Sequence, residues 1–328
     1  MDWRSVTGQV LDLDRDGVQT GHVFFPHSTD RSAYGSICVP LVSMRNGHGR
    51  TVLLMAGNHG DEWEGQIALR RLIQSLDLAD LRGQILILPA AHYPAVYEGT
   101  RTSPLDDGNL NRAFPGAATG TITSRIAHFI ETDLLPRCNL FLDLHSGGAS
   151  LDYLPGLLAV GPDRQLDALI DSFAAPVTYV YDRLLGGDAT STGAAARQGV
   201  PKLGSELGGA GRLSRSGLAA AQDGILRVLS HLGVWVGTPP VAVGATTRYR
   251  VLPAKTYVNA PADGLFEPSA WLGDRVGAGQ EAGWLHAVDA PWETPTKVCF
   301  SADGVVICQR PLVRVRRGDC LFHLGIEV

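Results

Sequence analysis

Cysteine is scarce in this sequence, and its placement suits neither of its usual structural roles. Five cysteines occur in 328 residues, at positions 38, 138, 299, 308 and 320. Their number is odd and no two have Cys-X-X-Cys spacing, which argues against a disulfide framework and against a zinc site built from cysteine. We therefore expect reduced thiols, which are typical of the cytoplasm.

Long apolar runs and basic blocks are missing as well. No stretch approaches the roughly 18 apolar residues of a membrane span, and Met1–Ser5 does not begin a secretion signal. The formal net charge is −5, without a cluster of lysine and arginine that would bind phosphates. These absences predict a cytoplasmic protein that binds neither membranes nor nucleic acid.

The order of apolar runs and helical patterns predicts an α/β fold. Strands are expected near 52–56, 84–89, 139–144, 157–161, 177–181 and 201–206, and helices near 63–76, 121–135, 163–173, 189–198 and 217–232. Such alternation favours a mixed, largely parallel sheet with helices on both faces. No glycine-rich phosphate-binding motif follows these strands, which argues against nucleotide binding.

Two domains are expected from the length and from a change of character near Thr238-Pro239-Pro240. Residues 1–237 would form the α/β domain, with residues 1–50 as a β-rich N-terminal segment that adds an antiparallel edge. Residues 238–328 contain two similar segments, which begin at Asp263-Gly264 and Asp303-Gly304. They predict a small all-β domain, a sandwich or flattened barrel, with a structural or substrate-gating role.

The polar turn Gly57–Glu62 stands between a buried strand, Thr51–Ala56, and a helix. His59 and Glu62 would therefore lie where open α/β sheets bind ligands. An imidazole and a carboxylate three residues apart can hold one metal ion if a third ligand comes from elsewhere. The alternative is a helix-start glutamate that complements the helix dipole. Asp61 could orient a ligand imidazole.

His145 is the expected third ligand, at the end of another apolar strand. Asp143 precedes it by two residues, so both side chains would point to the same face of the strand. A polar strand end without metal is the alternative. Two imidazoles and one carboxylate favour Zn²⁺ over Mg²⁺. Ser146 beside His145 lacks the glycine pattern of a nucleophile elbow, which argues against a serine hydrolase.

Glu206 ends a further apolar stretch and precedes four residues rich in glycine. A zinc hydrolase needs a base outside the metal's ligand set, and this carboxylate fits that task. Arg112 could bind a substrate carboxylate or stabilise an oxyanion, with Asn111 as a further donor. Arg101 could be a second guanidinium for the same anion. Exposed loop positions are the alternative for all of these residues.

Taken together, four stretches resemble the succinylglutamate desuccinylase/aspartoacylase family of zinc carboxypeptidase-like hydrolases. They are Gly57–Glu62, Asn109–Arg112, Asp143–Gly148 and Glu206–Gly209, in the family's order and separation. The resemblance covers nearly the whole chain, the C-terminal β-domain included. It implies a zinc carboxypeptidase-like fold and an enzyme that hydrolyses linear amide bonds of small N-acyl amino acids.

The resemblance also implies roles for individual residues. One zinc ion per chain would be held by His59, Glu62 and His145, and Glu206 would be the general base and acid. Substrate or oxyanion contacts would come from Arg112, Asn111 and Arg101. A homodimer is implied in the same way.

Two more stretches, 25–36 and 99–106, look closest to the Nα-acetyl-L-2,4-diaminobutyrate deacetylases of ectoine breakdown. Trp63 stands in place of an expected tyrosine, and Ser205 to Gly211 departs from the usual Thr-Glu-Leu and four glycines. The implied reaction releases acetate and diaminobutyrate. The side-chain ammonium of a diaminobutyrate substrate would need an acidic partner, for which the candidates are Asp106, Asp107 and Asp188. The alternatives are another N-acyl amino acid deacylase, a metallocarboxypeptidase or a non-catalytic binding module.

Overall fold

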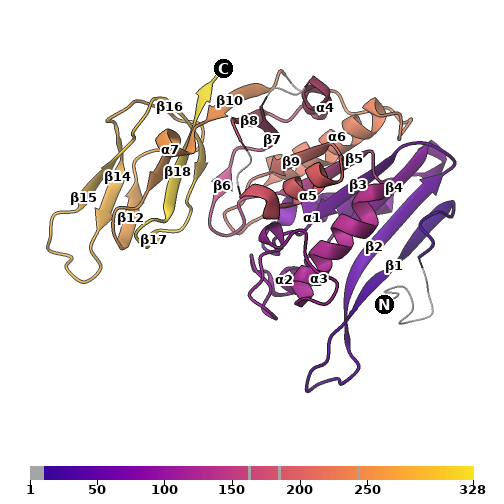
Figure 1. Ribbon diagram of the computed structural model, residues 1–328. Coiled ribbons are helices and arrows are strands. Elements are labelled where there is room, and N and C mark those ends of the chain that lie inside the picture. The colour runs from indigo at the N-terminus through magenta and orange to yellow at the C-terminus, as the bar shows by residue number, and fades with distance from the viewer. Residues whose placement is uncertain (1–10, 162–163, 184–185, 243) are drawn as a thin grey trace.

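One large sheet runs through most of the chain (Figure 1). The computed structural model describes residues 11–161, 164–183, 186–242 and 244–328. Within them, fourteen strands form this sheet, twelve along the main path and two, β6 and β11, beside it. In spatial order the twelve are β1 (Gly17–Pro26), β2 (Ser36–Asn46), β4 (Gly83–Leu88), β3 (Thr51–Ala56), β5 (Leu140–His145), β9 (Lys202–Glu206), β7 (Gly156–Val160), β8 (Val177–Tyr181), β10 (Thr247–Val251), β18 (Cys320–Glu327), β16 (Gly304–Gln309) and β13 (Arg275–Val276).

The centre of the sheet is parallel. Strands β4, β3, β5 and β9 pair in parallel, and so do β7, β8 and β10. The hairpin of β1 and β2 adds the expected antiparallel edge next to β4, and β7 is antiparallel to β9. The prediction of a mixed, largely parallel sheet is confirmed.

Helices cover both faces of this sheet, also as expected. On one face lie α1 (Trp63–Ser75), α4 (Arg164–Phe173) and α6 (Arg215–His231), in the same apolar cluster as Leu142 and Leu144 of β5. On the other lie α3 (Ile122–Phe129) and α5 (Ser191–Arg197), in the same apolar cluster as Phe141. Because side chains alternate along a strand, Asp143 and His145 share the face of Phe141.

Element boundaries differ from the predictions in a few places. The helix expected over 121–135 is α-helical only to Phe129; it continues as a π-turn, Ile130–Leu134, and a 3-10 turn, Leu135–Arg137, that contains Pro136. Proline lacks the backbone N–H that would extend the helix. Residue 163, the expected start of α4, lies outside the described residues. Short elements that were not predicted are α2 (Tyr93–Glu98), η1 (Leu78–Asp80), η2 (Leu110–Arg112), η5 (Gly187–Ala189), α7 (Pro253–Thr256) and β6 (Asp152–Tyr153).

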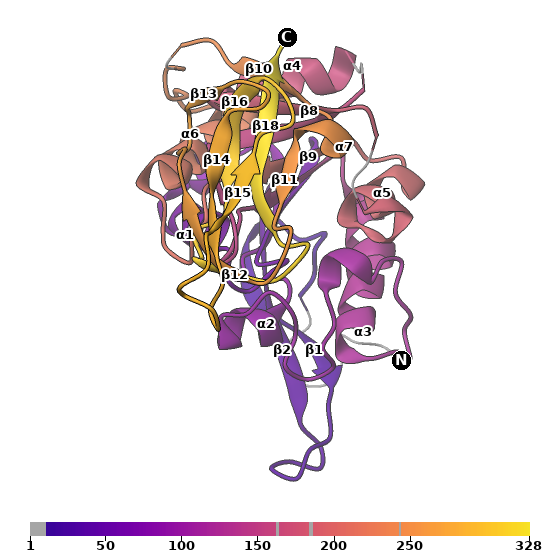
Figure 2. The same cartoon turned by 90° about the vertical axis from the view of Figure 1, so that its left-hand side faces the viewer.

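The C-terminal region is almost entirely β. A second, antiparallel sheet contains β15 (Thr296–Cys299), β14 (Glu281–His286), β12 (Gly264–Pro268) and β17 (Arg314–Val315). Phe266 of this sheet packs against Phe322 of β18, so the two sheets enclose one core. Figure 2 shows the strands of this region from the front. The boundary at 237/238 stays a prediction; β10, which follows it, pairs with β8 of the α/β part.

Strand β11 (Tyr257–Asn259) pairs with β18 and places Tyr257 against His323. The two rings are stacked, with centroids 3.7 Å apart and planes 2° apart. Tyr153 of β6 approaches from another side, its hydroxyl 3.5 Å from Nδ1 of His323.

Among the described helices, none is long and apolar enough to cross a bilayer.

The burial of His323 predicts that the folded protein loses stability in mild acid. Burial lowers the pKa of His323 from 6.5 to about 3. The unfolded chain therefore binds a proton that the folded chain does not, and stability falls as the pH drops from 6.5 toward 3, by at most about 1.4 kcal/mol per pH unit. Urea unfolding of His323→Gln between pH 7 and 4 should show a shallower loss than the parent protein. The exposed His231→Gln serves as control, and identical slopes for all three proteins would contradict this expectation.

Candidate active site

Three strands of the parallel sheet end beside one another and bring the predicted site residues together. β3 leads into the turn with His59 and Glu62, β5 ends at His145, and β9 ends at Glu206. In the sheet register His145 is opposite Glu206. The carboxyl ends of parallel strands form the ligand crevice of open α/β sheets, so the position follows from the topology.

The turn before α1 is tightly packed. Gly57 has φ +69°, which favours glycine. A Cβ atom on Gly60 would lie 1.9 Å from the carbonyl oxygen of Ala95, so a side chain cannot fit there. The side-chain amide of Gln66 donates to the carbonyl oxygens of Gly60 and Glu62 and ties the turn to the helix. These contacts and hydrogen bonds restrict the turn and hold the backbone that carries His59 and Glu62.

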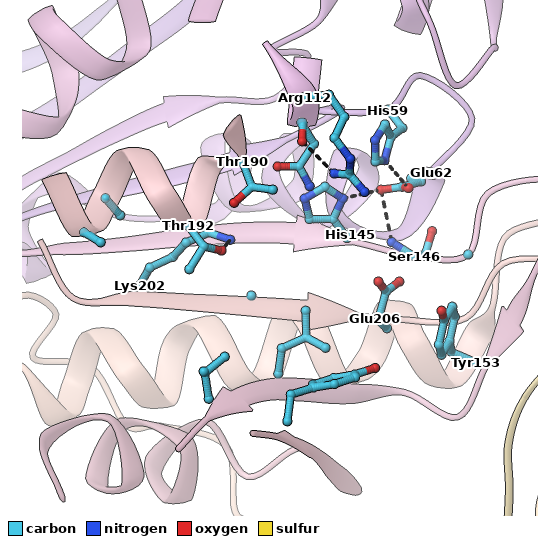
Figure 3. A pocket seen from close by; sticks show the side chains of 18 of the residues that line it. His59, Glu62, Arg112, His145, Ser146, Tyr153, Thr190, Thr192, Lys202 and Glu206 are labelled. Atoms are coloured by element: carbon cyan, nitrogen blue, oxygen red, sulfur yellow. Dashed lines mark hydrogen bonds and ion pairs between the residues drawn. The ribbon is translucent and has the colours of Figure 1, made fainter. Parts of the chain in front are cut away.

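Two imidazoles flank one buried carboxylate (Figure 3). Nδ1 of His59 lies 2.6 Å from Oε1 of Glu62, and Nδ1 of His145 lies 2.9 Å from Oε2. One ligand atom from each residue falls within 4.8 Å of the others, and all three residues are buried. Burial would raise the pKa of Glu62, but the imidazoles lower it to about 2. An ionised carboxylate and two imidazole nitrogens are a donor set that fits a metal ion.

Asp143 contacts Nε2 of His145, the ring nitrogen that does not face Glu62. Its Oδ2 lies 2.9 Å from Nε2 of His145 and accepts a hydrogen bond of 2.5 Å from the hydroxyl of Ser191. A carboxylate on the far nitrogen fixes the imidazole's tautomer and orientation. Asp61, expected to orient a ligand imidazole, accepts from the backbone N–H of Ala149 through one carboxylate oxygen, and its other oxygen has no hydrogen-bond partner among the described residues.

Glu206 faces the same cavity (Figure 3). Its Oε2 is buried and has no hydrogen-bond partner among the described residues. Burial, with a further contribution from Glu62, raises the pKa of Glu206 to about 8. This carboxyl group can therefore exchange a proton near neutral pH, which general acid–base catalysis requires.

The two predicted arginines line the cavity as well. Nη1 of Arg101 lies 3.6 Å from Oε1 of Glu62 and its side chain is 46% exposed. Arg112 ends the 3-10 turn η2 and donates to the carbonyl oxygen of Asn111. The Asn111 side chain accepts from the N–H of Ser191. The cavity therefore has guanidinium groups next to the His–Glu–His cluster, where an anion could bind.

The acidic residues expected to receive a substrate ammonium lie elsewhere. Asp106 accepts from the N–H and the hydroxyl of Thr123 at the start of α3. Asp107 and Asp188 are exposed. None of the three is among the described residues that line the cavity. They were predicted from their charge and their loop positions, and neither property determines which way a loop folds.

Several cavity residues were missed. The cavity, of about 660 Å³, has a wall of Tyr153, Tyr181 and Tyr257, the last from the C-terminal region. Asn109, which is not among the described residues that line the cavity, places its Oδ1 3.2 Å from Nε2 of His59. Lys202 lines the cavity too. It stands four residues before Glu206 on one strand, so both side chains lie on the same face, and this spacing could have identified it from the sequence.

Comparison with known proteins assigns the family. The model of the succinylglutamate desuccinylase/aspartoacylase catalytic domain matches residues 48–232. The chain belongs to this family. An Nα-acetyl-L-2,4-diaminobutyric acid deacetylase of Halomonas elongata is 35% identical over 316 residues, which is 95% of this chain and 92% of that protein.

Solved structures of this family extend the similarity to nearly the whole chain. A succinylglutamate desuccinylase/aspartoacylase from Rhodobacter sphaeroides is 36% identical, with a TM-score of 0.91 and coverage of 98% of this chain and 99% of that one. The product-bound ectoine utilization protein EutE (DoeB) from Ruegeria pomeroyi is 35% identical, with a TM-score of 0.91 and 96% coverage of both chains. The C-terminal β region is therefore part of the shared fold, as the resemblance implied.

Gly60 gives a test of the turn that aims His59 and Glu62. Gly60→Ala should destabilise the protein by about 2–4 kcal/mol, because its Cβ would overlap the carbonyl oxygen of Ala95. Urea unfolding measures the change. Two further variants are controls. Gly65→Ala in α1 measures the cost of a crowded Cβ away from this turn, and Gly161→Ala measures the cost of a positive φ alone, because nothing lies within 4 Å of a Cβ there. A loss below 1 kcal/mol for Gly60→Ala would show that the turn can relax.

Proposed function

We propose that this protein is a zinc-dependent amidohydrolase that removes the acetyl group from an N-acetylated amino acid. The proposed substrate is Nα-acetyl-L-2,4-diaminobutyrate, hydrolysed to 2,4-diaminobutyrate and acetate in ectoine catabolism. The observation that supports the reaction best is that Glu206 lines the same cavity as the His–Glu–His cluster, with a buried Oε2 that has no hydrogen-bond partner among the described residues. The substrate assignment draws on the named activity of the Halomonas elongata relative.

His59, Glu62 and His145 are the proposed ligands of one Zn²⁺ per chain. Two imidazole nitrogens and a carboxylate suit this borderline ion, and three protein ligands leave a position open, as in catalytic zinc sites. When bound, Zn²⁺ supplies Lewis acidity, which polarises a carbonyl group and lowers the pKa of water. Proton and metal compete for the same imidazole nitrogens, so binding requires both histidines to be neutral.

Glu206 is the proposed general base and acid. It takes a proton from the water that attacks the acyl carbonyl, and it gives that proton to the amine nitrogen as the C–N bond breaks. The new acetic acid keeps the oxygen from water, and the water's second proton passes from it to the amine, so that acetate and a protonated amino acid leave. A carboxyl group whose pKa is raised to about 8 can both accept and return the proton near neutral pH.

Arg112 and Asn111 are the proposed anchors of the substrate carboxylate, since a guanidinium can bind a carboxylate through two parallel hydrogen bonds. Arg101, whose Nη1 lies 3.3 Å from Nδ1 of His59 and 3.6 Å from Oε1 of Glu62, is the guanidinium proposed to stabilise an oxyanion. Arg112 is the alternative for that task.

A cytoplasmic location and a homodimer stay predictions.

Substrate preference tests the proposal directly. Product release should be fastest from Nα-acetyl-L-2,4-diaminobutyrate and at least tenfold slower from Nα-acetyl-aspartate and Nα-succinyl-glutamate. A preference for either of the others would keep an amidohydrolase and overturn the substrate. Cleavage of C-terminal residues from peptides, with none of the three turned over, would favour a metallocarboxypeptidase.

Glu206→Gln separates catalysis from binding. Glutamine keeps the size of the side chain but cannot carry the proton, so kcat should fall by about 10²–10⁴-fold. Zinc content and thermal stability should stay close to those of the parent protein, which elemental analysis and calorimetry would show. Retained turnover in this variant would contradict the role of Glu206, and a parent protein that binds zinc and ligands without turnover would be a binding module.

A further inference from the structure

Lys202 is a buried cation that the proposed reaction does not use. It begins β9, four residues before Glu206, and its side chain is 7% exposed. Its Nζ donates to the hydroxyl of Thr192 at 2.9 Å and lies 3.4 Å from Oδ2 of Asp143. Figure 3 shows Lys202 beside Thr192 at one end of the cavity, with Glu206 further along the same strand.

The strand makes room for this side chain. Lys202, Gly204 and Glu206 share one face of β9 because side chains alternate. Gly204 has no side chain, and a Cβ there would lie 3.4 Å from Nζ of Lys202. In the register between β5 and β9, Gly204 is opposite Asp143. The ammonium of Lys202 therefore extends over Gly204 toward the carboxylate of Asp143.

Asp143 needs such a partner, because its carboxylate is fully buried. Its Oδ2 faces His145, Ser191 and Asn58 as well as Lys202. Within contact distance, the ion-pair partners of Asp143 among the described residues are His145 and Lys202. A metal-bound imidazole is neutral, so with zinc in place Lys202 would be the one cationic side chain left within contact distance of Asp143 among the described residues, and the charge of zinc would act on Asp143 only across the imidazole ring. A buried charge without a counter-charge is strongly destabilising.

We infer that Lys202 is a positioning residue for the metal ligand His145, acting through Asp143. Its ammonium balances the Asp143 carboxylate, and the carboxylate then holds Nε2 of His145 so that Nδ1 points to the metal position. This inference rests on the proposed zinc site. It concerns how tightly the site holds zinc, and it gives Lys202 no contact with the substrate.

Zinc affinity of Lys202→Met is the test, measured by competition with a chromophoric chelator. Methionine keeps the length of the side chain and removes its charge. The dissociation constant for zinc should rise by about 10–100-fold, the usual effect of losing a group that supports a metal ligand. At saturating zinc, KM should stay within about twofold of the parent value. Lys297→Met, on the outer strand β15 with a half-exposed side chain, is the matched control and should bind zinc like the parent.

A double-mutant cycle with Asp143→Asn separates this route from a general packing effect. In the Asp143→Asn background no carboxylate remains to balance, so Lys202→Met should weaken zinc binding by less than about twofold further. The double variant also has no unpaired buried charge, so it provides the measurement if Lys202→Met alone does not fold. Equal losses in both backgrounds would overturn the inference.

An unchanged zinc affinity with a raised KM in Lys202→Met would also overturn the inference, because Lys202 would then contact the substrate. The proposed function can fail separately. A parent protein that binds zinc through His59, Glu62 and His145 but releases no acetate would refute the reaction, and the zinc affinities would still test Lys202.

Discussion

The carboxylate of Glu62 is 2% exposed and lies between two imidazole nitrogens, 2.6 Å from one and 2.9 Å from the other. Such a buried charge is stable only with positive charge beside it, which protons on the imidazoles or a metal ion would supply in addition to the half-exposed Arg101, 3.6 Å away. The rest of the site satisfies this requirement. The strand ends of β3 and β5 bring the imidazoles to the carboxylate, and a turn without room for a side chain at Gly60 holds the first of them.

The charges around this cluster form two groups with different tasks. Asp143 and Lys202 are buried and paired, and they hold an imidazole in place. Glu206 has an oxygen without a hydrogen-bond partner among the described residues, and its pKa is raised, so it is free to move a proton. The difference comes from position along β9, where Lys202 meets Asp143 over Gly204 and Glu206 stands at the strand's end, facing the cavity.

Much of this arrangement could be predicted from the sequence, because it depends on local patterns. Apolar runs that end in polar turns gave the strand ends, and these brought His59, Glu62, His145 and Glu206 to one crevice. The residues that were missed or misassigned depend on contacts between distant segments. Tyr257 reaches the cavity through the pairing of β11 with β18, and the Asp61 carboxylate is taken up by the backbone N–H of Ala149, from a loop that is distant in sequence.

The central claim is that a single zinc ion, held by the His–Glu–His cluster, is required for amide hydrolysis. The most direct test is to strip the protein of metal and titrate it with zinc while acetate release from Nα-acetyl-L-2,4-diaminobutyrate is followed. The account predicts no activity in the stripped protein and a rise to a plateau at one zinc per chain. Full activity of the stripped protein, or zinc bound at one per chain without any acetate release, would contradict it.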